Sequence, residues 1–221
     1  MQKVRTALIA GASGLVGGHL LSLLLKSDRY SQVISVGRHE LPVIHPKLDQ
    51  QVINFDKMKD YAADMVADDV FCCLGTTIKK AGSKENFYKV DYTYVAQLAE
   101  ITARKGAIQF LVVSAMGADA GSMIFYNKVK GEMERDVQQQ PFNAIHIFRP
   151  SLLLGERDEK RTGEDLASKV MKPLCGLMIG PLEKYKPIEA ITVARAMLAA
   201  AKAEKPGKHI HPSDDIAHMG S

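Results

Sequence analysis

Tyr126 and Lys130 are the residues whose types and spacing most directly suggest chemistry. If residues 125–138 form a helix, the two side chains are four positions apart and share one face. An ammonium beside a phenol favours the phenolate, so this pairing is expected to lower a tyrosine pKa from about 10 toward neutral pH. Such a tyrosine can give a proton to a carbonyl oxygen or take one from an alcohol.

Ser114 lies twelve residues before Tyr126, at the end of the apolar run 108–114. At the carboxyl end of a strand, its hydroxyl could polarise the same carbonyl. We therefore interpret Ser114, Tyr126 and Lys130 as catalytic, and we expect Tyr126 and Lys130 also to contact a nicotinamide cofactor. The structural alternative is a tyrosine packed at the sheet edge beside a solvated lysine.

A glycine turn lies near the N-terminus, between an expected strand at 4–10 and an expected helix at 14–26. Gly11 permits a tight turn, Gly14 lets the backbone approach a pyrophosphate, and Gly17 allows close packing of helix on strand. A tight turn that binds no ligand is the alternative. The residues of this turn expected to contact the cofactor are Gly11, Ser13, Gly14, Leu15, Val16 and Gly17.

The end of the second expected strand indicates which cofactor is used. NAD-binding proteins usually carry an acidic residue about 20 residues past the glycines, whereas here Arg38 occupies the strand end. A guanidinium can pair with a 2′-phosphate, so NADP(H) is favoured over NAD(H). Asp56, after the third expected strand, could accept a hydrogen bond from the adenine amino group or could cap the next helix.

Strands and helices alternate along the chain, which indicates an α/β fold with a doubly wound, mostly parallel sheet of Rossmann type. Residues 1–221 are expected to form a single NAD(P)-binding domain, in which 151–187 is a small C-terminal substrate cover with a loop at 155–163 and a helix at 165–178. The strands are expected at 4–10, 32–36, 51–55, 69–73, 108–114, 144–148 and 208–211, and the other helices at 85–105, 125–138 and 188–201.

Composition excludes several classes of protein. A net charge of +4, with no basic stripe interleaved with aromatics, argues against nucleic-acid binding. Three cysteines, two of them adjacent, form no disulfide framework, which favours a reducing, cytoplasmic setting. The apolar span 6–25 is interrupted by glycines and by His19, so we expect a buried strand–turn–helix and no membrane segment.

Two further groups of reactive side chains are expected to be structural. His209 and His211 share one face of a strand but lack an evident third ligand, so no metal site is expected. Cys72 and Cys73 lack an evident base and are expected to pack at a strand end near the cofactor.

The chain resembles the short-chain dehydrogenase/reductase superfamily, and within it the atypical branch of Tat-interacting-protein-like oxidoreductases. The resemblance implies a Rossmann fold that binds NADP(H), a Ser–Tyr–Lys site at 114, 126 and 130, and cofactor contacts by residues 11–17, by Arg38 and by the backbone of Leu74 and Gly75. Members of this branch are also described as regulators. The segments that carry the resemblance are 11–17, 36–38, 71–77, 90–91, 113–119, 126–132 and 148–150.

One residue departs from the superfamily pattern: Asp91 stands where many members have an asparagine that completes a proton relay. We predict an NADP(H)-dependent oxidoreductase that transfers a hydride between the nicotinamide and a small carbonyl or alcohol, with Tyr126 as the acid and base. An NADPH-binding regulatory or redox-sensing scaffold without turnover is the alternative, and an epimerase that recycles its cofactor is a third. The expected partner is a small-molecule substrate, and a homodimer is left open.

Overall fold

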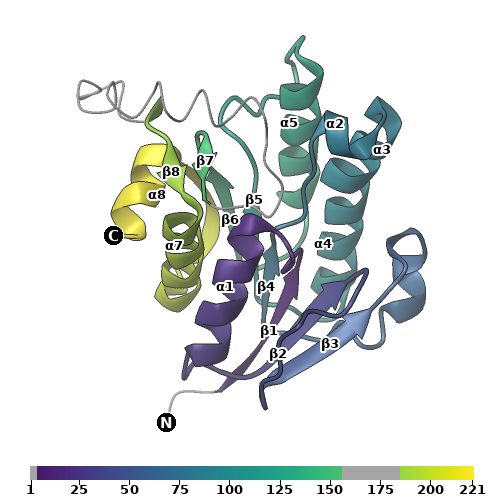
Figure 1. Cartoon of the computed structure of the whole chain (residues 1–221), viewed down its shortest axis with the longest axis vertical. Coiled ribbons are helices and arrows are strands. Elements are labelled where there is room, and N and C mark those ends of the chain that lie inside the picture. The colour runs from purple at the N-terminus through teal and green to yellow at the C-terminus, as the bar shows by residue number, and fades with distance from the viewer. Residues whose placement is uncertain (1–3, 156–184) are drawn as a thin grey trace.

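The computed structural model describes residues 4–155 and 185–221. Within these residues, seven parallel strands form one sheet in the order β3-β2-β1-β4-β5-β6-β9 (Figure 1). This strand order is the doubly wound arrangement, so the predicted Rossmann-type fold is confirmed. The strands are β1 (Arg5–Ala10), β2 (Tyr30–Gly37), β3 (Leu48–Val52), β4 (Asp69–Cys72), β5 (Gln109–Val113), β6 (Ala144–Arg149) and β9 (Gly207–Pro212), and β7 (Leu153–Leu154) pairs separately with β8 (Ile188–Glu189).

Helices cover both faces of the sheet (Figure 1). On one face lie α1 (Leu15–Lys26), α7 (Ala190–Ala203) and α8 (Ser213–Met219), and on the other lie α4 (Tyr94–Arg104) and α5 (Phe125–Val137). The shorter helical segments are η1 (Phe55–Tyr61), α2 (Ile78–Ala81), α3 (Lys84–Tyr88) and η2 (Lys89–Thr93).

The two-sided cover explains why the central strands are apolar at consecutive positions. In β1, Ala7 and Ile9 pack in the core on the α1 and α7 side, while Leu8 and Ala10 pack in the core on the α4 and α5 side. All four side chains are fully buried. Successive strand residues point to opposite faces, so a strand covered on both faces must be apolar throughout.

The third strand lies earlier in the sequence than expected. The prediction of a strand at 51–55 is wrong at its end, because β3 runs from Leu48 to Val52 and the 3-10 helix η1 begins at Phe55. Val52 is paired with Gly37, the last residue of β2, so the chain beyond it has no strand partner. Asn54 then caps η1, since its side chain accepts a hydrogen bond from the Asp56 N–H.

The helix expected at 85–105 consists of three consecutive helical segments. Between α3 and α4, η2 is a single π-helical turn, in which Asp91 is 1% exposed. π-helical turns occur mostly as local bulges and frequently lie at functional sites. This turn brings the carboxylate of Asp91 into the interior. A regular helix would orient that side chain differently.

The apolar span 6–25 forms most of β1, the glycine turn and all of α1 except Lys26, as expected. None of the helices among the described residues combines the length and the apolar character needed to cross a membrane. The substrate cover expected at 151–187 is described only at 151–155 and 185–187. The rest of it, with the expected helix at 165–178, lies outside the described residues.

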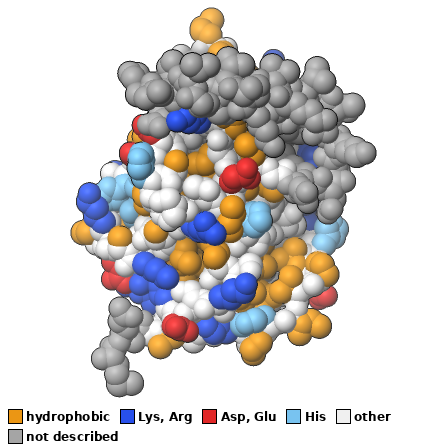
Figure 2. Space-filling view, turned by 60° about the vertical axis from the view of Figure 1, so that its left-hand side comes forward, with side chains coloured by type: hydrophobic (Ala, Val, Ile, Leu, Met, Phe, Trp, Pro, Cys, Tyr) orange, Lys and Arg blue, Asp and Glu red, His pale blue; other side chains and the backbone are white. Residues whose placement is uncertain are grey.

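The surface is mixed in charge. On the described part of the face in Figure 2, lysine and arginine side chains are interspersed with apolar and uncharged ones. This distribution agrees with the modest net charge of +4.

Strands β6 and β9 bring three histidine rings together beneath α7 and α8. His146 Nδ1 lies 3.0 Å from His211 Nε2, and the His146 ring stacks on His209 with centroids 4.9 Å apart. His146 therefore supplies the third histidine that the sequence pattern lacked. The rings stack instead of converging, and the described residues contain no group of three or more ligands placed to hold a metal ion.

The histidine cluster predicts a stability that depends on pH. Burial, followed by the charges of His211, His209 and Lys205, lowers the pKa of His146 from 6.5 to about 4. Between these two pH values, the His146 side chain binds more protons in the unfolded chain than in the folded one. Its contribution to the free energy of unfolding is therefore fully present above pH 6.5 and is lost as the pH falls toward 4. We expect the free energy of unfolding of His146→Phe to decrease by about 1–2 kcal/mol less than that of the wild type between pH 6.5 and 4. Denaturant unfolding at several pH values measures this difference.

The exposed loop residue His39 supplies the control for this prediction. His39→Gln removes a histidine outside the cluster, so comparison with it separates the effect of His146 from the loss of any histidine. An equal slope in the wild type and in His146→Phe would contradict the assignment.

Candidate active site

The candidate residues meet because parallel strands end at one edge of the sheet. Ala10 is paired with Val36 and with Cys72, and Val113 is paired with Phe148. The residues that follow these strand ends include Gly11, Arg38, Cys73 and Ser114. This carboxyl edge is where open α/β sheets bind ligands.

A cleft of about 720 Å³ opens at this edge. It brings together most of the residues that the sequence singled out: Ser13, Gly14, Leu15, Val16, Leu74, Gly75, Ser114, Tyr126 and Lys130 all line it. Gly11 and Gly17 lie behind this lining and shape the turn, whereas Arg38 and Asp56 are outside the lining. Leu152 and Leu153, at the start of the expected substrate cover, also line the cleft.

The glycine turn has the geometry that the sequence predicts. Gly11 has φ +87°, and a Cβ there would stand 2.6 Å from the Cys73 carbonyl. A Cβ on Gly17 would stand 2.1 Å from the Gly11 oxygen. These two positions require glycine, because the helix, the turn and the β4 end approach one another too closely for any side chain.

The N-terminus of α1 is left open to an anion. Gly14 caps the helix without a side-chain hydrogen bond, and the first turn contains no acidic residue. The N–H groups of this turn, together with the positive end of the helix dipole, fit the pyrophosphate of a dinucleotide. The absence of a Cβ at Gly14 gives that group room to approach.

Arg38 and Asp56 lie away from the cleft and differ in what they contact. Arg38 is exposed just past β2, and its guanidinium makes no hydrogen bond to another described residue. Asp56 accepts hydrogen bonds from Lys89 and Tyr94, which lower the pKa of its carboxyl. The helix-cap alternative for Asp56 is wrong, because Asn54 fills that role.

Tyr126 and Lys130 lie four residues apart on α5 and both line the cleft, as expected. The Tyr126 ring packs on Phe87 with centroids 5.5 Å apart, and its hydroxyl makes no hydrogen bond to another described residue. Lys130 is 4% exposed, and its ammonium lies 2.7 Å from Asp91 Oδ1. Burial disfavours that ammonium, but Asp91 and Tyr126 outweigh burial and raise the pKa of Lys130.

Asp91 also fixes the loop after β4. Its Oδ2 accepts a hydrogen bond of 2.8 Å from the Thr76 N–H. A Cβ on Gly75 would stand 3.4 Å from Asp91 Oδ1 and 3.8 Å from Lys130 Nζ. The residue that departs from the superfamily pattern therefore joins Lys130 to the loop that carries the expected backbone contacts of Leu74 and Gly75.

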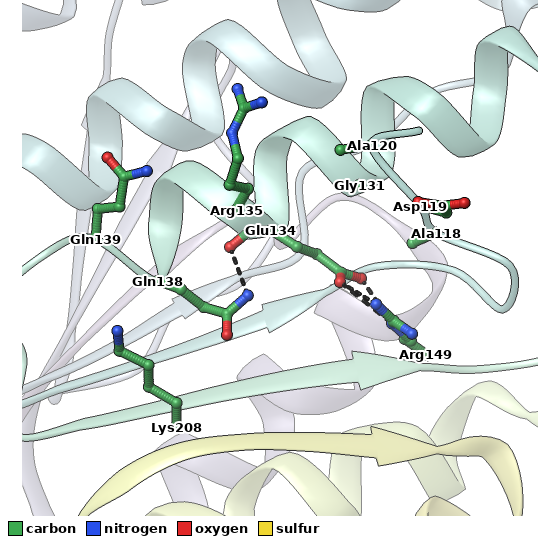
Figure 3. Close-up of a pocket in the computed structure, with 10 residues that line it drawn as sticks. All are labelled: Ala118, Asp119, Ala120, Gly131, Glu134, Arg135, Gln138, Gln139, Arg149 and Lys208. Atoms are coloured by element: carbon green, nitrogen blue, oxygen red, sulfur yellow. Dashed lines mark hydrogen bonds and ion pairs between the residues drawn. The ribbon is translucent and has the colours of Figure 1, made fainter. Parts of the chain in front are cut away.

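Ser114 is engaged differently from expectation. Its Oγ donates a hydrogen bond of 2.5 Å to Glu134 Oε1 and not to Tyr126. Arg149 holds the same carboxylate, with Nε 3.0 Å from Oε1 and Nη2 2.5 Å from Oε2 (Figure 3). Glu134 is 2% exposed and does not line the cleft; with Arg149 and Lys208 it lines a separate hollow of about 440 Å³.

Sequence reasoning missed the roles of Glu134, Arg149 and Gly131. Glu134 follows Lys130 by four residues, so the helical spacing that joined Tyr126 to Lys130 would also have reached it. A Cβ on Gly131 would stand 2.1 Å from the Ala120 nitrogen, so this glycine lets the loop before α5 pack on the helix. No spacing rule predicts that contact.

The adjacent cysteines are poor nucleophiles. Cys72 is buried in β4, and burial raises the pKa of its thiol to about 12. Cys73 lines the cleft, and burial again raises the pKa of its thiol. Both side chains would be neutral near pH 7, which agrees with the expected packing role.

Comparison with known proteins identifies the family. The sequence profile of the NAD dependent epimerase/dehydratase family matches residues 7–213. Protein HTATIP2 of Rattus norvegicus is 37% identical over 221 residues, which cover 98% of this chain and 89% of that protein. Protein FMP52, mitochondrial, of Saccharomyces cerevisiae is 35% identical over 162 residues, which cover 71% of this chain and 69% of that protein.

Solved structures agree on the fold. The UDP-glucuronic acid 4-epimerase from Bacillus cereus, in complex with NAD, superposes with a TM-score of 0.66 at 16% identity. The match covers 93% of this chain and 77% of that chain. At this identity the likeness concerns the fold alone.

The glycine geometry predicts opposite effects at two adjacent positions. Gly17→Ala should destabilise the protein by about 1–3 kcal/mol, because its methyl group would overlap the Gly11 oxygen. Gly18→Ala should be neutral or stabilising, since its nearest atom, the Ala12 oxygen, is 3.6 Å away and alanine favours a helix by about 0.5–1 kcal/mol. Denaturant unfolding of both variants measures the difference, and equal effects would contradict the described turn.

Proposed function

The chain belongs to the NAD-dependent epimerase/dehydratase family, and from that premise we propose that it is an NADP(H)-dependent oxidoreductase. The proposed reaction transfers a hydride between the nicotinamide and a small carbonyl or alcohol. The observation that carries this proposal is the cleft in which the glycine turn, Tyr126 and Lys130 face one another.

The proposed chemistry divides among three side chains. The cofactor, when bound, supplies or accepts the hydride. Tyr126 gives a proton to the carbonyl oxygen, or takes one from the alcohol, through a hydroxyl that has no other partner among the described residues. Lys130 keeps a positive charge near that hydroxyl, and Asp91 holds the lysine in position.

The preference for NADP(H) rests on Arg38. Arg38 is exposed and follows β2, whose Val36 is paired with Ala10, the last residue before the glycine turn. A 2′-phosphate at that strand end would receive a charge-assisted hydrogen bond. The UDP-glucuronic acid 4-epimerase from Bacillus cereus, which shares the fold, was solved in complex with NAD, so the proposed preference differs from the cofactor in that structure.

A second function is supported by the Asp91–Lys130 ion pair. A lysine paired with a buried carboxylate suits a scaffold that binds NADPH and signals through a partner without turnover. The two functions differ in one observable, which is Tyr126-dependent oxidation of NADPH in the presence of a carbonyl. The cytoplasmic location expected from the cysteines stays a prediction.

Replacing Arg38 should change the cofactor preference. We expect NADPH to stabilise the wild type more than NADH does at equal concentration, because the ligand that binds more tightly stabilises the folded protein more. Arg38→Ala should weaken NADPH binding about tenfold or more and leave NADH binding unchanged. Thermal-shift titration measures both, with Arg104→Ala, an exposed arginine on α4, as the control. A wild-type preference for NADH would refute the role of Arg38.

Replacing the Tyr126 hydroxyl should stop the chemistry without disturbing the cofactor. We expect Tyr126→Phe to lower the turnover of NADPH with a reducible carbonyl by about 10²- to 10⁴-fold, because the proton donor is lost. NADPH binding in a thermal-shift titration should be retained. Steady-state kinetics on a panel of small aldehydes and ketones supplies the measurement.

Tyr92→Phe is the matched control for this experiment, because the Tyr92 hydroxyl binds Asp136 and lies outside the cleft. Full turnover in Tyr126→Phe would rule out the proposed role of Tyr126. NADPH binding without oxidation of NADPH by any carbonyl, and without conversion of an alcohol, would favour the scaffold.

A further inference from the structure

The proton of Ser114 is held on the side away from the substrate. Ser114 lines the cleft, yet its Oγ donates to Glu134 at 2.5 Å, within the usual range for a hydroxyl on a carboxylate. Ser114 is 5% exposed and Glu134 is 2% exposed, so water does not compete for this bond. A serine hydroxyl has one hydrogen and two lone pairs. Because the hydrogen is used in the bond to Glu134, Oγ can only accept a hydrogen bond from a group in the cleft.

Arg149 offers Glu134 only hydrogen-bond donors. Its guanidinium contacts both carboxylate oxygens, at 3.0 Å and 3.2 Å from Nε and at 2.5 Å from Nη2 (Figure 3). Glu134 raises the pKa of Arg149 through these hydrogen bonds, so the cation persists. Both oxygens of Glu134 accept from this guanidinium, so the hydrogen of the Ser114–Glu134 bond comes from the serine hydroxyl.

We propose that Glu134 is a positioning residue that makes Ser114 a hydrogen-bond acceptor toward the cleft, so that the site favours carbonyl substrates carrying a hydroxyl donor beside the carbonyl. This inference rests on the proposed oxidoreductase function and gives its substrate a chemical class. It also corrects the expected role of Ser114, because a carbonyl oxygen has no proton to offer a lone pair. Tyr126 alone then donates to the carbonyl, and Ser114 receives the neighbouring hydroxyl.

Whether Ser114 donates or accepts a hydrogen bond strongly affects which substrates the cleft can bind. A substrate hydroxyl that meets the Ser114 lone pair is satisfied, whereas an ether in its place would put two acceptors face to face. Sites built to bind a substrate hydroxyl reject analogues that lack it because a polar group is left unpaired. We therefore expect discrimination of about tenfold or more at this partly open cleft.

The first test is kinetic and uses 3-hydroxybutan-2-one and 3-methoxybutan-2-one. Both carry an oxygen beside the ketone, but only the first has a hydroxyl donor. The wild type should reduce the hydroxy ketone with a kcat/KM about tenfold or more above that of the methoxy ketone. Ser114→Ala should bring this ratio down toward one.

Glu134→Gln should also lower the ratio. Arg149 would bind the amide oxygen, which turns the amide N–H₂ toward Ser114 and releases the serine proton to the cleft. NADPH binding should be unchanged, because Glu134 does not line the cleft. Glu100→Gln, on the exposed side of α4, is the control and should keep the wild-type ratio.

The second test needs no substrate. In the NADPH complex, the buried Ser114 hydroxyl proton should exchange slowly and give a resonance far downfield of ordinary serine hydroxyl protons. Proton NMR should lose this resonance in both Ser114→Ala and Glu134→Gln and retain it in Glu100→Gln. Because Ser114→Ala removes only one heavy atom, the hydroxyl oxygen, it tests the bond even where Glu134→Gln fails to fold.

The outcomes separate the two proposals. Equal reduction of both ketones by the wild type would overturn the acceptor role of Ser114 and leave the oxidoreductase function standing. A missing downfield resonance would overturn the bond to Glu134. If NADPH binds but neither the ketone pair nor the wider panel is reduced, the oxidoreductase function and the substrate class both fall, while the resonance still decides the direction of the bond.

Discussion

The charge of Lys130 is the constraint on which the rest of the site depends. An ammonium that is 4% exposed cannot remain unpaired, and Asp91 at 2.7 Å is its partner. A buried ion pair adds little net stability, but removal of one partner typically costs about 3–5 kcal/mol, because the other charge is left buried alone. The π-helical turn that places Asp91 and the loop nitrogen of Thr76 that binds it are therefore parts of one arrangement.

Helix α5 extends that arrangement by its periodicity. Tyr126, Lys130 and Glu134 follow at intervals of four, so they form one stripe along the helix. Each meets a different element: the ring of Phe87 from α3, the carboxylate of Asp91 from η2, and the hydroxyl of Ser114 from the end of β5. The sheet edge and two helices thus converge on one helix face, which is how residues far apart in sequence come to share a cleft.

Much of this could be predicted from the sequence because it follows from local rules. The apolar strands, the glycine turn and the spacing of Tyr126 and Lys130 each depend on a few neighbouring residues. The end of β3 could not be predicted, since it is set by where its partner β2 stops at Gly37. The directions of the Ser114 and Lys130 hydrogen bonds were equally inaccessible, because Glu134 and Asp91 reach them only through tertiary packing.

Lys130 and Tyr126 carry different information about function. Lys130 is needed by the fold, since its charge balances the buried Asp91 whether or not a substrate is ever bound. The Tyr126 hydroxyl is different, because it makes no hydrogen bond to another described residue and its ring alone supplies the packing on Phe87. A phenylalanine would pack as well, so the polar atom has no structural task among the described residues. Of the two, the Tyr126 hydroxyl is therefore the atom whose presence argues for chemistry in the cleft.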